Sequence, residues 1–197
     1  MTAAANGATN TGSKATERVP GEIDMWFFVV FEALIFTSYF CVYLYSRTQH
    51  PKAFLEAQSA LTLPLGIVDT ILLLTSSWAI ARCVRHARAA RYRAAQQLAL
   101  LTGGLGVAFL ALKLVEWVTL IQDGHTFTSN DFMQHFFFLT GMHAIHLLIG
   151  FVVLGVLFRQ LADPQRRSQE TIETCSTYWH TVDLYWVLIF ALLYIVR

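Results

Sequence analysis

Apolar residues gather in five long blocks along the 197-residue chain, and short polar stretches separate the blocks. A helix needs about 20 apolar residues to cross the hydrocarbon core of a bilayer. Each block reaches that length, and none shows the strict alternation of a half-buried strand. The pattern therefore predicts an all-α membrane protein, a bundle of five transmembrane helices over Ile23–Tyr45, Thr62–Ala81, Leu98–Ile121, Phe132–Leu161 and Thr177–Val196.

The composition agrees with a membrane protein. Charged residues make up 14% of the chain, whereas soluble domains carry about 25%. The net charge of +1 gives no indication of a nucleic-acid partner. The three cysteines, Cys41, Cys83 and Cys175, are far apart and form no CxxC spacing that would suggest a metal site or a disulfide framework.

Lysine and arginine are distributed unevenly between the two ends of the predicted helices. Ten of them lie before the first helix and in the polar breaks at 82–93 and 159–167, and only Arg47, Lys52 and Arg197 lie on the other side. Because the cytoplasmic loops of membrane proteins are enriched in lysine and arginine, this bias predicts a cytoplasmic N-terminus and a C-terminus outside. Residues 1–21 are rich in Ala, Thr, Asn and Gly and are expected to form a disordered cytoplasmic tail ahead of a single domain at 22–197.

Every predicted helix contains at least one ionisable side chain, and three helices contain a pair spaced three residues apart. Such groups are costly in contact with lipid, so they are expected to face the inside of the bundle or a partner protein. The groups are Glu32, Asp69, Lys113, Glu116, His143, His146, His180 and Asp183.

The depth of these groups predicts some of their partners. Asp69 and Lys113 both lie roughly 10–12 Å from the outer ends of their helices, and Glu116 lies one turn closer to the surface on the Lys113 face. We therefore expect Lys113 to bridge Asp69 and Glu116, with the second and third helices packed together. His180 and Asp183 share one face and are expected to form one buried hydrogen-bonded unit.

Three interpretations of the buried polar groups remain open from the residues alone. The sequence "HAIH" at 143–146 could hold a metal or haem, because histidine is a common ligand. The groups could form a proton or ion pathway. They could also form a structural network that packs the helices and docks a partner, which the small residues in "TGGLG" at 102–106 favour.

Two long motifs resemble a known family. The stretch "FFFLTGMHAIHLLIGF" (136–151), followed by "TYWHTVDLYWVLIFALLYIVR" (177–197), is similar to subunit III of the haem-copper cytochrome oxidases. Shorter matches at 31–40, "FEALIFTSYF", and at 112–124, "LKLVEWVTLIQDG", occur in the same order as in that family. The resemblance spans roughly residues 23–197.

The resemblance implies a multi-pass subunit of the bacterial plasma membrane without an active site of its own. Such a subunit packs against the catalytic subunit I, stabilises it, binds membrane lipids and supports proton uptake, while haem and copper belong to the partner. Glu32 matches a reactive buried carboxylate of the family, and further matches are Glu116, His143, His146, Glu173, His180 and Asp183. No lipid-binding residues are carried over, because the chain lacks the first two helices of the seven-helix form.

The resemblance leaves the partner complex open. Lys113 and the stretch "LLLTSSWAIA" at 72–81 are closer to a short subgroup that accompanies nitric oxide reductase. The partner could be a cytochrome c oxidase, a quinol oxidase or a nitric oxide reductase, and a free-standing proton-coupled transporter or an assembly factor remains an alternative. A catalytic role is excluded. The haem-copper centre requires six histidines within helices, and this chain has seven histidines in all, of which four lie in or beside predicted loops: His50, His86, His125 and His135.

Overall fold

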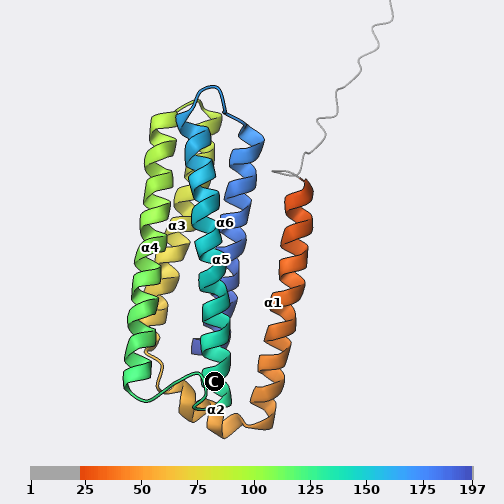
Figure 1. The fold of residues 1–197 in the computed structure, drawn as a ribbon, viewed down its shortest axis with the longest axis vertical. Coiled ribbons are helices and arrows are strands. Elements are labelled where there is room, and N and C mark those ends of the chain that lie inside the picture. Colours follow the sequence, from red (N-terminus) through yellow and green to blue (C-terminus); the bar gives the residue numbers. More distant parts are fainter. Residues whose placement is uncertain (1–22, 197) are drawn as a thin grey trace, which may run out of the picture.

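The computed structural model describes residues 23–196, and the predicted tail at 1–21 lies outside them. The described part is a bundle of helices (Figure 1). Five long helices are apolar enough to cross a membrane, which confirms the predicted fold class. In chain order the elements are α1 (Ile23–Gln49), α2 (Pro51–Gln58), α3 (Leu63–Arg88), α4 (Tyr92–Gln122), α5 (Asp131–Ala162), α6 (Gln169–Phe190) and the π-helical turn η1 (Ala191–Ile195).

The arginine-rich stretch at 82–93 is not the long break that the sequence predicts. Helix α3 continues to Arg88 and α4 begins at Tyr92, so most of these arginines lie on helices. Alanine and arginine are strong helix formers, and positive charge in the last turn of α3 complements the helix dipole. The chain reverses within a short turn, in which Ala90 adopts a positive φ of 56°.

Two further boundaries differ from the prediction. The short helix α2 was not expected; it starts at Pro51, a residue that suits the first position of a helix because it needs no N–H partner there. Helix α6 begins at Gln169 rather than near Thr177, because the Ser168 side chain caps it by accepting a hydrogen bond from the backbone N–H of Thr171 at 3.3 Å.

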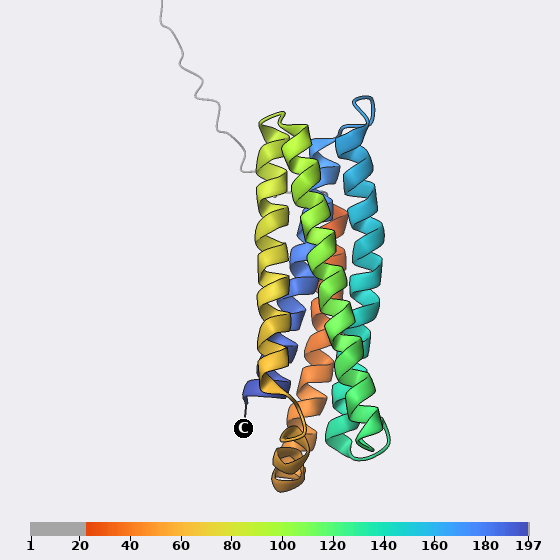
Figure 2. The same cartoon turned by 90° about the vertical axis from the view of Figure 1, so that its left-hand side faces the viewer.

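Helices α3, α4, α5 and α6 form the centre of the bundle. Helix α3 packs mainly against α4 and α6, and α5 packs against α6 and α4. Helix α1 stands at the side and touches α5 and α6 more sparsely (Figure 1). Turned by 90°, the bundle shows α3 and α4 in front with α1 behind them (Figure 2).

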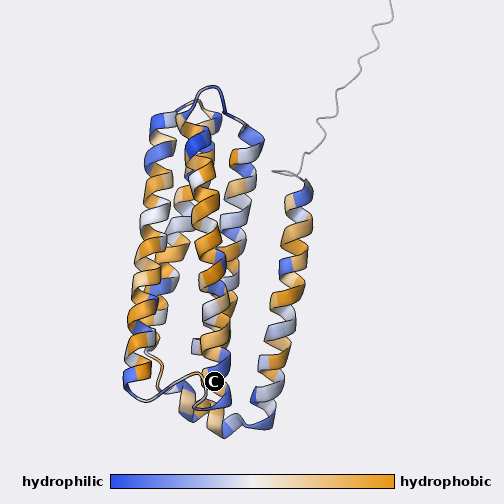
Figure 3. Cartoon of the chain, in the orientation of Figure 1, coloured by the Kyte–Doolittle hydropathy of each residue, from blue (hydrophilic) through white to orange (hydrophobic). Residues whose placement is uncertain are grey.

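The hydropathy of the helices follows the membrane pattern. Apolar residues cover the long middle parts of the helices, and hydrophilic residues concentrate at the two ends of the bundle (Figure 3). Large apolar side chains remain exposed on the outer surface, such as Phe27 on α1, which is 72% exposed. A surface of this kind is solvated by lipid or covered by partner proteins, and the polar groups of interest lie inside it.

Candidate functional site

Four polar side chains meet in one buried cluster where α3, α4 and η1 come together. The Lys113 Nζ atom lies 2.9 Å from Asp69 Oδ2 and 2.6 Å from Glu116 Oε2. The lysine is 2% exposed, Asp69 0% and Glu116 4%, so the cluster is closed to solvent. This is the pairing that the depths of the three residues predict.

Tyr194, on the π-helical turn, completes the cluster and was not predicted from the sequence. Its hydroxyl lies 2.8 Å from both carboxylate oxygens of Glu116, to which it donates, and accepts a hydrogen bond from Lys113 at 3.1 Å. The Lys113 ammonium also lies 4.5 Å from the centre of the Trp186 ring. Gly66 admits the tyrosine ring, because a Cβ atom there would be 2.9 Å from it. The cluster, defined here as Asp69, Lys113, Glu116 and Tyr194, therefore joins α3, α4 and the end of α6.

Glu32 of α1 and His146 of α5 form a second buried contact. The distance from Glu32 Oε2 to His146 Nε2 is 2.8 Å. The other ring nitrogen, Nδ1, lies 2.7 Å from the backbone carbonyl oxygen of Met142. A carbonyl oxygen can only accept, so Nδ1 carries a hydrogen and donates it to Met142. Glu32 Oε2 has no hydrogen-bond partner among residues 23–196, so its approach to Nε2 is a close polar contact that joins α1 to α5.

His143 does not share a site with His146, although the two are three residues apart. His143 is fully buried and its ring contacts Phe109 of α4 and Trp186 of α6, with centroid distances of 5.5 and 5.3 Å. Neither of its ring nitrogens has a hydrogen-bond partner among residues 23–196. The "HAIH" stretch thus places its two histidines in different interhelical spaces, which does not favour the joint metal or haem site considered from the sequence.

His180 and Asp183 do not form the hydrogen-bonded unit that the sequence predicts, because neither carboxylate oxygen of Asp183 has a hydrogen-bond partner among residues 23–196. The Ser77 hydroxyl of α3 lies 2.6 Å from His180 Nδ1 and next to the Asp183 carboxylate. The neighbouring Ser76 accepts a hydrogen bond from the Trp179 indole at 2.8 Å. Two consecutive serines on α3 therefore meet two consecutive residues on α6. The only signal in the sequence was this pair of serines in the middle of an apolar helix.

Glu173 lies at the arginine-rich end of the bundle, away from the other groups. Its carboxylate is 3.0 Å from Arg88 and accepts a hydrogen bond from Gln169 at 2.8 Å. This ion pair joins α3 to α6 near solvent, since the Arg88 side chain is 57% exposed.

The arrangement as a whole consists of cross-helix contacts. The cluster around Lys113 joins α3, α4 and η1, the Glu32–His146 contact joins α1 and α5, and the serine contacts join α3 and α6. Within residues 23–196, no three His, Cys, Asp or Glu side chains are grouped so as to hold a metal ion. The geometry can hold the helices together.

The sequence matches a known protein family. Residues 5–197 match the family described as cytochrome c oxidase subunit III. Cytochrome c oxidase subunit 3 of Bacillus sp. (strain PS3) is 28% identical over 88% of this chain and 84% of its own length. Cytochrome bo(3) ubiquinol oxidase subunit 3 of Pseudomonas aeruginosa is 29% identical over 86% of this chain and 82% of its own.

A third relative combines two subunits. Heme-copper oxidase subunit I+III of Aeropyrum pernix is 26% identical over 87% of this chain, a region that makes up 22% of that protein. The family match covers nearly all of the present sequence and includes all five membrane-spanning helices. The chain therefore belongs to the cytochrome c oxidase subunit III family, the accessory membrane subunits of haem-copper terminal oxidases.

Proposed function

We propose that this chain is the non-catalytic subunit III of a haem-copper oxidase of the cytochrome c oxidase type, in a bacterial plasma membrane. The observation that carries the proposal is the family match over residues 5–197. The partner follows from the relative whose name joins subunits I and III in one protein. By this analogy the partner of the present chain is the catalytic subunit I, in a one-to-one complex.

The chain contributes no haem or copper ligand in this proposal. His146 is engaged by Glu32 and Met142, and His180 is engaged by Ser77. His143 alone could not supply the ligand set of a haem-copper centre. Redox chemistry is therefore assigned to the partner, and the exposed arginines at the ends of the helices are assigned to membrane orientation rather than to a nucleic acid.

The first role that we assign to the chain is to stabilise the catalytic subunit. The buried cluster around Lys113 and the contacts of Ser76 and Ser77 with α6 support this role, because they fix the helices of the bundle relative to one another. A rigid bundle presents a defined apolar surface on which another membrane subunit can pack.

Removing this chain from the complex tests that role. The oxidase purified without it should keep its haem absorption and its initial turnover but lose activity faster during catalysis. A complex that lacks haem, or one that is as durable as the complete enzyme, would contradict the assignment.

Comparing reduced cytochrome c with a quinol as electron donor identifies the type of oxidase, since relatives of both types match this chain.

The second role is to support proton uptake through Glu32 and His146. A carboxyl group and an imidazole whose atoms lie 2.8 Å apart can pass a proton between them, and this supports the proposed role. The site lies between α1 and α5, and α1 is packed more sparsely against the bundle than the other long helices are.

Replacing Glu32 by glutamine tests the second role. The amide can donate an N–H to His146 Nε2, so the bundle should assemble normally, but the pair can no longer exchange its proton with a carboxylate. Glu32→Gln should therefore reduce turnover or its durability, whereas Glu56→Gln, on the exposed surface of α2, should change neither. Unchanged turnover in a fully assembled Glu32→Gln complex would leave Glu32 with a packing role only.

A further inference from the structure

The last turn of the described chain is held by side chains from the opposite end of the sequence. The Tyr43 hydroxyl of α1 donates a hydrogen bond to the backbone carbonyl of Leu192 at 3.0 Å. The Gln58 amide of α2 donates to the carbonyls of Leu193 at 2.9 Å and Val196 at 3.0 Å. These bonds join the arm, defined as helices α1 and α2, to η1 and the residue that follows it.

Arg47 adds a further hydrogen bond from the arm, to the Val196 carbonyl at 2.7 Å. The last four carbonyls of a helix have no partner within the helix, so they need water or a side chain. Tyr43 is 0% exposed and Gln58 is 7% exposed, so the bonds that these two side chains make are largely shielded from water. The arm therefore caps the end of η1.

The other side of the same turn is fixed to the core of the bundle. Tyr194 of η1 donates to the Glu116 carboxylate and accepts from Lys113, and both of these residues are on α4. Its ring lies against Gly66 of α3. The last turn thus connects two bodies, with α3 and α4 on one side and the arm on the other.

Helix α1 is otherwise held loosely. It packs against α5 and α6 more sparsely than the other long helices pack against one another. An apolar groove of about 510 Å³ opens between α1 and α6. Polar contacts of α1 with α5 include Glu32 with His146 at 2.8 Å and Ser46 with His135 at 3.2 Å. Because so few contacts fix α1, its bonds to the last turn make up a large part of its attachment.

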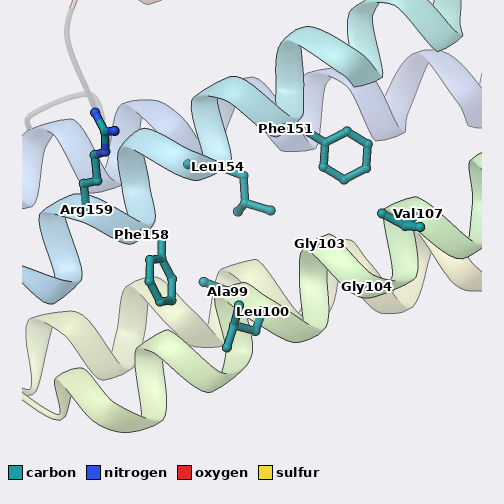
Figure 4. Close-up of a pocket in the computed structure, with 10 residues that line it drawn as sticks. Ala99, Leu100, Gly103, Gly104, Val107, Phe151, Leu154, Phe158 and Arg159 are labelled. Atoms are coloured by element: carbon teal, nitrogen blue, oxygen red, sulfur yellow. The ribbon is translucent and has the colours of Figure 1, made fainter.

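Helices α4 and α5 show that a groove alone does not loosen a helix. An apolar groove of about 430 Å³ also lies between these two helices, lined by glycines and bulky side chains (Figure 4). On one side of it Gln96 donates to the Leu161 carbonyl at 3.2 Å, and on the other side Trp117 donates to Thr140 at 3.2 Å. Helices α4 and α5 are therefore tied at both ends of their groove, whereas the hydrogen bonds of α1 are concentrated at the end that meets η1.

We propose that the last turn is a latch for the arm, and that the latch holds Glu32 in contact with His146. With the latch closed, α1 lies along α5 and α6. With its hydrogen bonds broken, α1 swings outward as one rigid helix. Glu32 lies eleven residues before Tyr43, about 16 Å along the same helix, so the swing draws its carboxylate away from α5. The latch thereby regulates the site between α1 and α5, a consequence that rests on the role in proton uptake proposed for Glu32.

Hydrogen exchange of the full chain in mild detergent, followed by mass spectrometry, tests the latch. The latch variant, Tyr43→Phe combined with Gln58→Leu, removes three of the hydrogen bonds to the turn and keeps the side-chain volumes similar. Exchange of the α1 backbone should rise about tenfold, because the lost bonds make local opening easier, while α3 and α4 should keep their rates. The matched control is Tyr45→Phe combined with Ser59→Ala, which changes an exposed tyrosine of α1 and a hydrogen bond within the end of α2. The control should leave exchange unchanged.

Two results would overturn the latch: equal exchange of α1 in the latch variant and the control, or faster exchange spread equally over α3 and α4. Turnover of the oxidase complex tests the link to the site separately. Where Glu32→Gln lowers turnover, the latch variant should lower it to a similar degree, and full turnover would refute the link. Where Glu32→Gln has no effect, the role in proton uptake fails, while the exchange result still decides whether the latch exists.

Discussion

Replacing Lys113 by methionine should destabilise the bundle severely. Methionine preserves the length and much of the volume of the side chain but removes the only cation within hydrogen-bonding distance of Asp69 and Glu116 among the described residues. Glu116 would keep its hydrogen bond from Tyr194, whereas Asp69, which is 0% exposed, would keep no ion pair. Breaking one partner of a buried ion pair costs about 3–5 kcal/mol, and the second carboxylate places this variant at the upper end.

The control is the exposed ion pair between α3 and α6. Arg88→Met removes the contact of α3 with Glu173 at 3.0 Å, but with the arginine side chain 57% exposed the loss should be at most about 1 kcal/mol. Both variants are compared with the unmodified chain by thermal and SDS-induced unfolding in detergent. The free energy of unfolding, or the transition midpoint where unfolding is irreversible, is the quantity to compare.

A double variant separates loss of charge balance from loss of packing. Lys113→Met combined with Asp69→Leu removes the stranded carboxylate, so it should recover part of the stability lost in Lys113→Met. The reasoning is refuted if Lys113→Met is as stable as Arg88→Met, or if the double variant is no more stable than the single one. Either result would mean that the cluster contributes little beyond side-chain volume.

Two further predictions follow from the backbone and from the charge distribution. Gly66→Ala should lower stability by about 1–3 kcal/mol because its methyl group meets the Tyr194 ring, whereas Gly104→Ala should raise it by up to about 1 kcal/mol; unfolding midpoints that rank the other way would contradict this. In intact cells a membrane-impermeant thiol reagent should label His125→Cys and not Arg91→Cys, tested in a background without the native cysteines, and the reverse pattern would invert the proposed orientation.

The sequence predicted those features that depend on position along a helix. Apolar blocks located the five spanning helices, and equal depth below the outer surface predicted that Lys113 meets Asp69. Depth follows from counting residues at a fixed rise, so the order of residues along the chain is enough to determine it.

Features that depend on the rotation and neighbours of a helix could not be predicted. His143 and His146 are three residues apart, yet one faces α4 and α6 while the other faces α1. Tyr194 reaches Glu116 from a π-helical turn, and Gly66 leaves room for its ring. Such contacts depend on which helices are adjacent and how they are turned, and a single sequence does not specify this.

The central claim, that this chain is an accessory subunit bound to a haem-bearing catalytic subunit, is tested most directly by the composition of the complex it forms. The tagged chain is purified from its native membrane in mild detergent, and haem and peptide amounts are measured on the same sample. The account predicts a one-to-one ratio of this chain to a large haem-containing subunit, and no haem absorption from the chain once it is separated. A homo-oligomer without any haem-bearing partner, or haem that remains with the isolated chain, would contradict it.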